Sequence, residues 1–439
     1  MLRSPDLRLS CLSSEFALTF SMFILSRVPV ILLLLVMAFF ILVLDHFVHL
    51  QFLWVFPLYT RSLGLWLVFV IVDTFLVQWG YLQVRWLTWC AGILFFTALC
   101  GLEWLGILII AWPILLWVLS RQQEHIFKRL IPFSLLVFLF FAHFAARLQP
   151  ALEGSGVILK LFSLFFFLRQ VAWSFSVVRK QHIPFLPTME YFLSPIFWLC
   201  PMHTSYLTTQ RFFKRVPQLE RAEEGKALGW IGLGIAYALV FGLAASRGLQ
   251  WLLELYPRGL WHWHWQEFVA VGPVLFALNY LEKARVTYLT AGFLRLQGCE
   301  IEPDFRHPWA ARDLVDYWRR FHYWVIEFYE DYFYSPLQAW FCQFVSHRLA
   351  LIGVNLITFS VASFTIHYLV YPGDLVLCVL LGLIFGLMAL LHSRLSLFLQ
   401  KHWVGLPVTW VTVFFLYFLA FPVYVLGWGF PLLLNFFLR

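Results

Sequence analysis

Charged residues are scarce in this sequence. Asp, Glu, Lys and Arg make up 12% of the chain, and 62% of it is hydrophobic. About a quarter of the residues in a typical soluble domain are charged, so the composition excludes an ordinary soluble protein. The strict alternation of apolar and polar residues that half-buried strands show is also missing. Long apolar runs recur instead, and the mean hydropathy is +0.80. These features predict an α-helical membrane protein, because helices satisfy their backbone groups internally.

Several common site motifs are absent as well. The seven cysteines form no CxxC pair and no disulfide framework, and most of them lie in apolar runs. The chain has no Walker A sequence, no GxSxG elbow and no HExxH. His262 and His264 lack further ligands at a fitting spacing, so we expect no metal site. The net charge of +8 comes from Lys and Arg in short loops, which does not indicate a nucleic-acid partner.

The apolar runs predict one membrane-embedded domain over residues 1–439. The expected fold class is all-α and polytopic, with roughly 10–13 transmembrane or re-entrant helices. A Gly382-x-x-x-Gly386 pair would allow close helix packing. Candidate spans lie near 16–44, 47–59, 62–80, 87–100, 103–119, 130–146, 157–178, 228–246, 266–284, 346–369, 374–391 and 404–437.

Basic residues set the expected orientation. The clusters in 179–182 and 211–226 should both be cytoplasmic by the positive-inside rule. The apolar stretch between them, YFLSPIFWLCPM at 191–202, is too short to cross the membrane twice and contains two prolines. We therefore expect a re-entrant or interfacial hairpin there, which is tolerated where irregular backbone is buried in protein.

The stretch DYWRRFHYWVIEFYEDYFYSP at 316–336 concentrates charge in this apolar chain. Read as one helix, it pairs Asp316 with Arg320 and places His322 one turn from Arg319. A histidine beside an arginine and away from water should favour its neutral form. A solvated amphipathic helix at the membrane interface is the competing interpretation. His367, in VASFTIHYLVYPGD, lies deep in an apolar run and there needs a partner or a cavity.

The stretch 295–337, RLQGCEIEPDFRHPWAARDLVDYWRRFHYWVIEFYEDYFYSPL, resembles the signature region of the membrane-bound O-acyltransferases. It is most similar to the bacterial branch that includes alginate O-acetyltransferase and the membrane protein of teichoic-acid D-alanylation. Residues 167–202 resemble a further segment of that family more loosely. The counterparts in the signature are Gly298, Phe305, Pro308, Asp316, Trp318, Arg319, Arg320, His322, Asp331, Tyr332, Tyr334, Pro336 and Leu337.

This resemblance implies a ring of helices around a central tunnel, with the signature region over 295–370. It implies catalysis by two histidines, His367 as the general base and His322 as a second essential residue in the tunnel. Arg319, Arg320, Trp318 and Asp316 are the residues expected to bind the donor. No tightly bound cofactor is expected, and the donor would be a cytoplasmic thioester of coenzyme A or an acyl carrier protein.

The expected reaction is transfer of an acyl group, acetyl by the family's example, to a hydroxyl of a cell-envelope polysaccharide at the bacterial inner membrane. The expected partners are membrane lipid, the acyl donor and an extracytoplasmic acyltransferase or other glycan-pathway protein. The residues around His367 depart from the family's Leu-Trp-His-Gly, because this chain reads Ile366-His367-Tyr368. Two alternatives remain open: a transporter or channel that uses the charged helix as a substrate path, and a catalytically degenerate partner in glycan export.

Overall fold

The computed structural model describes residues 59–78, 81–99, 103–122, 155–178, 183–199, 201–214, 221–255, 265–308 and 314–363, with 382–383, 386–387 and 390. Over these residues the chain is all-α, and the described part contains no strand. The predicted base His367 lies outside the described residues.

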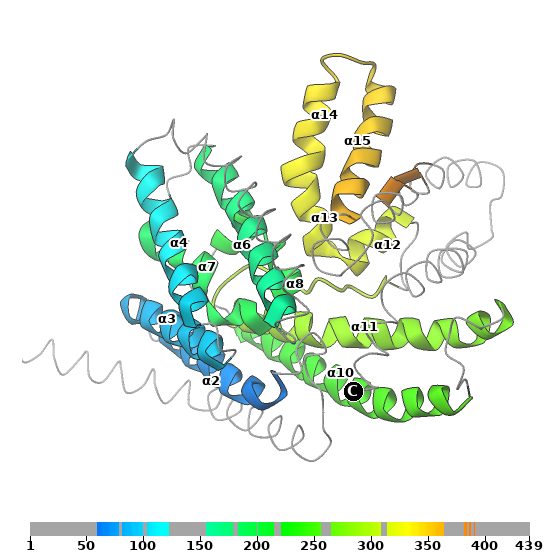
Figure 1. Ribbon diagram of the computed structural model, residues 1–439, viewed down its shortest axis with the longest axis horizontal. Coiled ribbons are helices and arrows are strands. Elements are labelled where there is room, and N and C mark those ends of the chain that lie inside the picture. The colour runs from blue at the N-terminus through cyan, green and yellow to red at the C-terminus, as the bar shows by residue number, and fades with distance from the viewer. Residues whose placement is uncertain are drawn as a thin grey trace, which may run out of the picture.

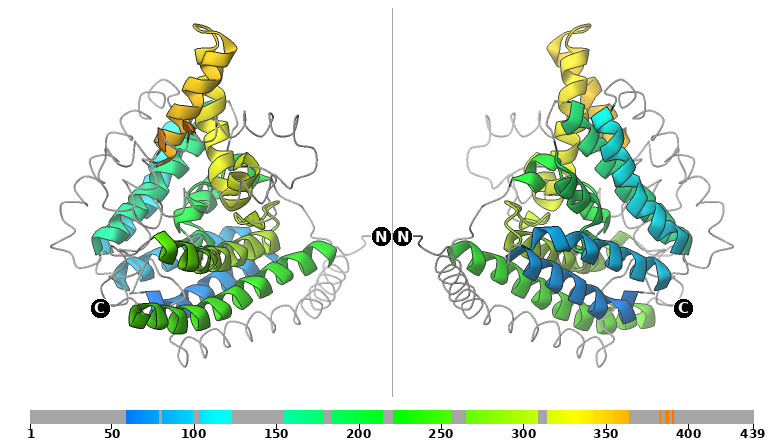
Figure 2. Two further views of the ribbon diagram at one scale, coloured as in Figure 1. Left: turned by 90° about the vertical axis from the view of Figure 1, so that its right-hand side faces the viewer. Right: turned by 90° about the vertical axis from the view of Figure 1, so that its left-hand side faces the viewer.

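The long helices form where the apolar runs predict them. They are α2 (Tyr59–Gln78), α3 (Leu82–Leu99), α4 (Glu103–Gln122), α6 (Ser155–Val178), α10 (Arg221–Leu255), α11 (Trp265–Leu296) and α15 (His347–Ser363). Figures 1 and 2 show α2, α3, α10 and α11 together in one tier, from which α4 and α6 rise on one side. The main core lies between these two groups and includes the fully buried Trp89, Trp173 and Phe197.

Helices α10 and α11 form a closely packed antiparallel pair. A Cβ atom at Gly234 would lie 2.8 Å from the Arg285 carbonyl oxygen, and one at Gly292 would lie 2.5 Å from Cγ1 of Ile231. Glycine is therefore required at both contacts, because any larger residue would push the helices apart. Since α11 leads directly into the loop at 297–308, this contact fixes where that loop begins.

The predicted hairpin at 191–202 is a broken, buried segment. It runs through α7 (Phe185–Leu193), the 3₁₀ helix η1 (Pro195–Leu199), α8 (Pro201–Thr204) and α9 (Thr209–Phe213). Pro195 and Pro201 stand at the starts of η1 and α8, where a missing N–H costs no helical hydrogen bond. Residues 191–197 are all buried, which agrees with irregular backbone enclosed by protein.

Helix α11 ends in a Schellman motif. Gly298 has a φ of 85°, its N–H donates to the Arg295 carbonyl, and the Cys299 N–H donates to the Leu294 carbonyl. Glycine suits this position because the left-handed conformation strains residues that carry a Cβ. The turn directs the following residues, 299–308, back into the interior, where Ile301, Asp304 and Phe305 are buried.

The prediction of one continuous helix over 316–336 is wrong. The chain forms α12 (Leu314–Phe321), α13 (Tyr323–Tyr329), a π-helical turn η4 (Glu330–Tyr334) and α14 (Ser335–Phe341). His322 lies between α12 and α13 in a non-helical conformation, with φ −147° and ψ 62°. The helical stripe that placed His322 one turn from Arg319 therefore does not exist.

Helices α14 and α15 form a hairpin that projects from the rest of the molecule (Figures 1 and 2). Its tip is exposed and carries large apolar side chains, with Phe344 68% and Leu349 61% accessible. Gly382 and Gly386 contact α15 as their spacing predicts, since a Cβ at Gly382 would lie 2.5 Å from Cα of Ser360.

In the described part of the chain, one helical stretch has the length and apolar content to cross a bilayer: Glu223–Phe241 of α10, with a hydropathy of 1.2. Such a stretch is weak evidence by itself, since core helices of soluble proteins pass the same criterion. Shorter apolar stretches lie at Val68–Val77, Val84–Phe95, Gly106–Arg121 and His347–Ala362. The number of membrane crossings therefore stays a prediction.

Candidate functional site

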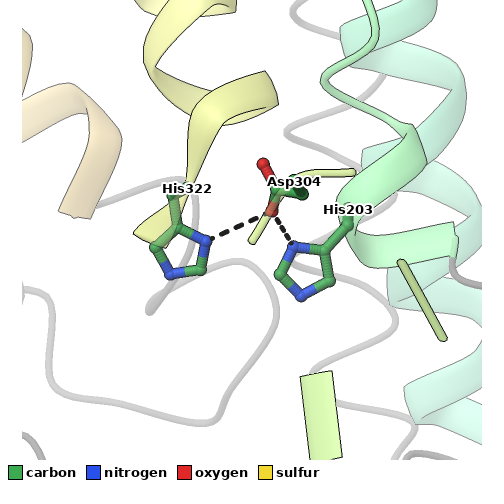
Figure 3. A group of neighbouring side chains, drawn as sticks. All are labelled: His203, Asp304 and His322. Carbon is green, nitrogen blue, oxygen red and sulfur yellow. Dashed lines mark hydrogen bonds and ion pairs between the residues drawn. The ribbon is translucent and has the colours of Figure 1, made fainter. Parts of the chain in front are cut away.

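Three segments that are distant in sequence bring two imidazoles and a carboxylate together. His203 comes from α8, Asp304 from the loop after α11, and His322 from the break between α12 and α13 (Figure 3). We call these three residues the His–Asp–His cluster. Asp304 is fully buried and His203 is 4% exposed, so the cluster lies in the protein interior.

One carboxylate oxygen serves both imidazoles. Asp304 Oδ2 lies 2.9 Å from Nδ1 of His203 and 3.5 Å from Nδ1 of His322. The two rings are stacked, with centroids 5.5 Å apart and an interplanar angle of 16°. Figure 3 shows both rings directing Nδ1 toward Asp304 and their second nitrogen away from it. When Nδ1 of such a ring carries the proton and donates to the carboxylate, Nε2 becomes the basic nitrogen.

Asp304 also explains why the helix restarts after His322. Its Oδ1 accepts the Trp324 backbone N–H at 2.6 Å, and its carbonyl oxygen accepts the Tyr323 N–H at 3.1 Å. The first N–H groups of a helix have no partner within the helix, and here a residue from another segment supplies two acceptors. Asp304 is therefore fixed through three of its oxygens, which presets the position of Oδ2.

His203 is held in place through the backbone carbonyl of the next residue, Thr204, which accepts a hydrogen bond from Arg169. Arg169 of α6 donates to the Thr204 carbonyl at 2.7 Å and to the Tyr191 carbonyl at 3.0 Å. Its guanidinium is fully buried, and its Cζ lies 3.8 Å from the Phe197 ring centroid. Contacts to both ends of the 191–204 segment fold this segment around Arg169, and this brings α8 to the cluster.

Aromatic rings enclose the cluster. Phe305 meets the His203 and His322 rings edge-on at 5.5 and 5.2 Å, and Phe321 meets His322 at 4.7 Å. Behind Phe305 lies Tyr280 of α11, at 6.1 Å between ring centroids. These rings keep water from one side of the cluster and lower the local dielectric, which strengthens electrostatic interactions inside it.

Asp304 and His322 both lie outside the long apolar helices. Their pKa values follow from burial and from their contact with each other. Burial lowers the pKa of His322 to about 4; Asp304 opposes this effect, and the Lys283 ammonium adds to it. Burial alone would raise the pKa of Asp304, but hydrogen bonds from His203 and His322 outweigh it and hold the value at about 2. At neutral pH, His322 is therefore neutral and Asp304 is ionised. The neutral form of His322 is as predicted, although its main cause is burial rather than Arg319.

Three of the residues predicted to bind the donor, Asp316, Arg319 and Arg320, have partly or largely exposed side chains. Arg320 pairs with Asp316 at 2.9 Å, as their spacing predicts. Arg319 pairs with Glu330 at 2.9 Å, and both side chains are about half exposed. Trp318 belongs to α12 and directly precedes Arg319. The structure therefore brings His322 into a buried site and leaves both arginines outside it in ion pairs.

A second buried polar group, the Arg85 network, lies between α2, α3 and α7. The Arg85 guanidinium contacts Asp73 at 3.1 Å and Glu190 at 2.7 Å, with all three side chains nearly inaccessible. Asp73 also accepts Trp89 Nε1 at 2.8 Å and Gln297 Nε2 at 2.9 Å. Every group in this network faces an oppositely charged or hydrogen-bonding partner, which is the arrangement of a structural ion pair.

Sequence reasoning missed His203 and Asp304. The alternation of Glu300, Glu302 and Asp304 suggests three acids on one exposed face, yet only Asp304 is buried. The available signal for His203 was its place directly after a proline-broken apolar segment, where a buried polar residue requires a partner. No spacing in the sequence connects it to position 304.

A scan against protein-family models gives no match for this chain, and a search of curated proteins finds none either.

Proposed function

We propose that the chain is a polytopic membrane-bound O-acyltransferase. It would move an acetyl group from a cytoplasmic thioester, of coenzyme A or an acyl carrier protein, to a hydroxyl of a cell-envelope polysaccharide at the bacterial inner membrane. The observation that carries this proposal is a convergence. The two stretches that resemble the family, 167–202 and 295–337, are far apart in sequence, yet His322 of one lies against His203, the residue that directly follows the other.

The chemistry requires a base, because a hydroxyl attacks a thioester only as its proton is removed, a service worth roughly 10²–10⁴-fold. His367 is the proposed base, and its structure lies outside the described residues. His322 is proposed as a positioning residue. With the proton on Nδ1, which faces Asp304 Oδ2 at 3.5 Å, its Nε2 would accept a hydrogen bond, which suits the acceptor hydroxyl rather than an oxyanion.

The proposal can be tested on membranes from cells that express the full chain. These are incubated with acetyl-CoA labelled in the acetyl group, and label is counted in polymeric material before and after mild alkali, which releases O-esters. We expect alkali-labile label with the wild type and its loss in His367→Ala. His347→Ala, at an exposed position of α15, is the matched control and should transfer normally.

Normal label in His367→Ala would remove the catalytic assignment. Absence of alkali-labile label in the wild type, with a carrier-protein thioester tried as the second donor, would favour the transporter or degenerate-partner alternatives.

A further inference from the structure

The His–Asp–His cluster has the composition of a metal site. We propose that His203, Asp304 and His322 bind one divalent transition-metal ion of the Zn²⁺ type, through both imidazole Nδ1 atoms and the Oδ2 atom of Asp304. Two imidazoles and one carboxylate are the protein ligands of a well-known class of zinc centre that leaves one coordination position open. This inference stands on the geometry of the three residues and does not depend on acyl transfer.

The spacing of the donor atoms supports the proposal. One potential ligand atom from each residue can be chosen so that all three lie within 4.8 Å of one another. Ligands at about 2.0–2.2 Å from one tetrahedral Zn²⁺ lie roughly 3.3 Å apart. The distances from Oδ2 to the two Nδ1 atoms, 2.9 and 3.5 Å, fall on either side of that value. The three donor atoms lie within 4.8 Å of one another, so the imidazole rings would move closer together on binding the ion.

The surroundings already hold the ligands in place. The Trp324 N–H binds the other carboxylate oxygen of Asp304 and fixes the orientation of this side chain. Arg169 fixes α8 through the Thr204 carbonyl, one residue after His203. Outer contacts of this kind orient metal ligands and raise affinity, typically by 10–100-fold. Phe305 and Phe321 supply the apolar shell that limits competing water.

The donor set also defines the class of ion. Two nitrogen ligands exclude Ca²⁺ and Mg²⁺, which prefer oxygen, and favour Zn²⁺ or Fe²⁺.

Metal binding would change what the second nitrogen of His322 does. With Nδ1 bound to the ion, Nε2 carries the proton and becomes a hydrogen-bond donor. The same ring would then donate to an oxyanion or carbonyl oxygen, whereas in the metal-free protein it accepts from a hydroxyl.

The test uses the full-length chain purified in detergent without chelators. Elemental analysis should find about one Zn²⁺ or Fe²⁺ per chain, or the stripped protein should take up about one Zn²⁺. Replacement by Co²⁺ should give the visible absorption of a low-symmetry nitrogen–oxygen site. His203→Gln should bind Zn²⁺ at least about 100-fold more weakly, because an amide can still donate to Asp304 but is a poor ligand. His203→Cys should restore binding, and the control His347→Ala should not alter it.

Two results would overturn the metal site: a wild-type chain that takes up no stoichiometric Zn²⁺, Fe²⁺ or Co²⁺, or a His203→Gln variant that binds as the wild type does. Should the His203 variants fail to fold, His322→Gln takes their place, because it removes another proposed ligand and is read by the same metal content and Co²⁺ spectrum. The acyl-transfer assay reads label in polymer and not metal, so each proposal can fail without the other.

Discussion

The His–Asp–His cluster and the Arg85 network are both buried, both span several helices and both centre on an aspartate, yet they are built on different principles. Around Asp73 the acceptors are crowded with donors: a guanidinium, an indole, an amide and a hydroxyl. Around Asp304 two imidazoles use one nitrogen each, and each keeps a second nitrogen directed elsewhere (Figure 3). The first arrangement pairs a guanidinium with carboxylates, whereas the second combines groups that can bind a metal ion or take up and release a proton.

The loop after α11 connects these two regions. Gln297, at its start, donates to Asp73 of the Arg85 network, and Asp304, further along, belongs to the His–Asp–His cluster. The completed network therefore anchors the loop, and the cluster is assembled on the anchored part. The difference teaches that a buried aspartate in this chain has a structural role where it neutralises a guanidinium, and is a candidate for function where it orients two imidazoles.

The largest effect is expected from breaking the Arg85 network. Arg85→Met leaves the buried carboxylates of Asp73 and Glu190 without their cation, which should cost about 3–5 kcal/mol and lower the yield of folded protein. Thermal unfolding in detergent and the monodisperse fraction measure it. Arg319→Met, which breaks an exposed pair, is the matched control. Equal losses in the two variants would contradict the structural assignment.

A smaller loss of stability is expected in the His–Asp–His cluster, together with loss of function. Asp304→Asn keeps the size of the side chain and an acceptor for Trp324, but removes the charge that both imidazoles face. We expect about 1–3 kcal/mol of destabilisation and acetyl transfer lowered by about 10² or more. Unfolding and alkali-labile label are measured on the same preparation. Full transfer with normal stability would show that the cluster is dispensable.

The pH dependence of the free energy of unfolding should further distinguish the His–Asp–His cluster from the Arg85 network. The pKa of His322 is lowered from 6.5 to about 4 in the folded protein, so between these values the unfolded chain binds more protons. Stability is then fully present above about pH 6.5 and declines as the pH falls toward 4, by up to ~1.4 kcal/mol per pH unit. In chelator-treated protein, His322→Gln should flatten this slope and Arg85→Met should not. A slope that His322→Gln leaves unchanged would assign the titration to another group.

The smallest effect on stability is expected at the predicted donor-binding arginines. Arg319→Ala and Arg320→Ala break partly exposed ion pairs and should change the free energy of unfolding by at most about 1 kcal/mol. If these residues bind donor phosphate, KM for acetyl-CoA should rise several-fold while kcat changes little. An unchanged KM in both variants would remove them from the donor site.

The long helices were predictable because a long run of apolar residues indicates a helix without any knowledge of the contacts it makes in the fold. The expected ranges 62–80, 103–119 and 157–178 correspond to α2, α4 and α6 within a few residues. The broken backbone after residue 193 was predictable from its prolines, and residues 191–197 are buried, while the re-entrant or interfacial placement stays a prediction. That this segment leads to His203 was not foreseen.

The break at His322 could not be read from the sequence. Residues 316–329 contain no glycine or proline, so no helix-breaking residue marks the interruption. The interruption arises because Asp304, from another segment, accepts the N–H groups of Tyr323 and Trp324. Its cause is a tertiary contact, and the same contact forms the His–Asp–His cluster, so helix continuity and the site were missed together.

The π-helical turn at Glu330–Tyr334 sets the rotational phase of everything that follows it. A π turn holds one residue more than an α turn, and each residue of a helix advances its direction by about 100°. Deleting one residue there would convert the turn to α-helix and leave the α14–α15 hairpin in nearly its present direction, because four α residues turn about as far as five π residues. Conversion of the turn to α-helix without a deletion would instead rotate the exposed face with Trp340 and Phe344 toward a different side of the molecule, with no change in the sequence of the hairpin itself.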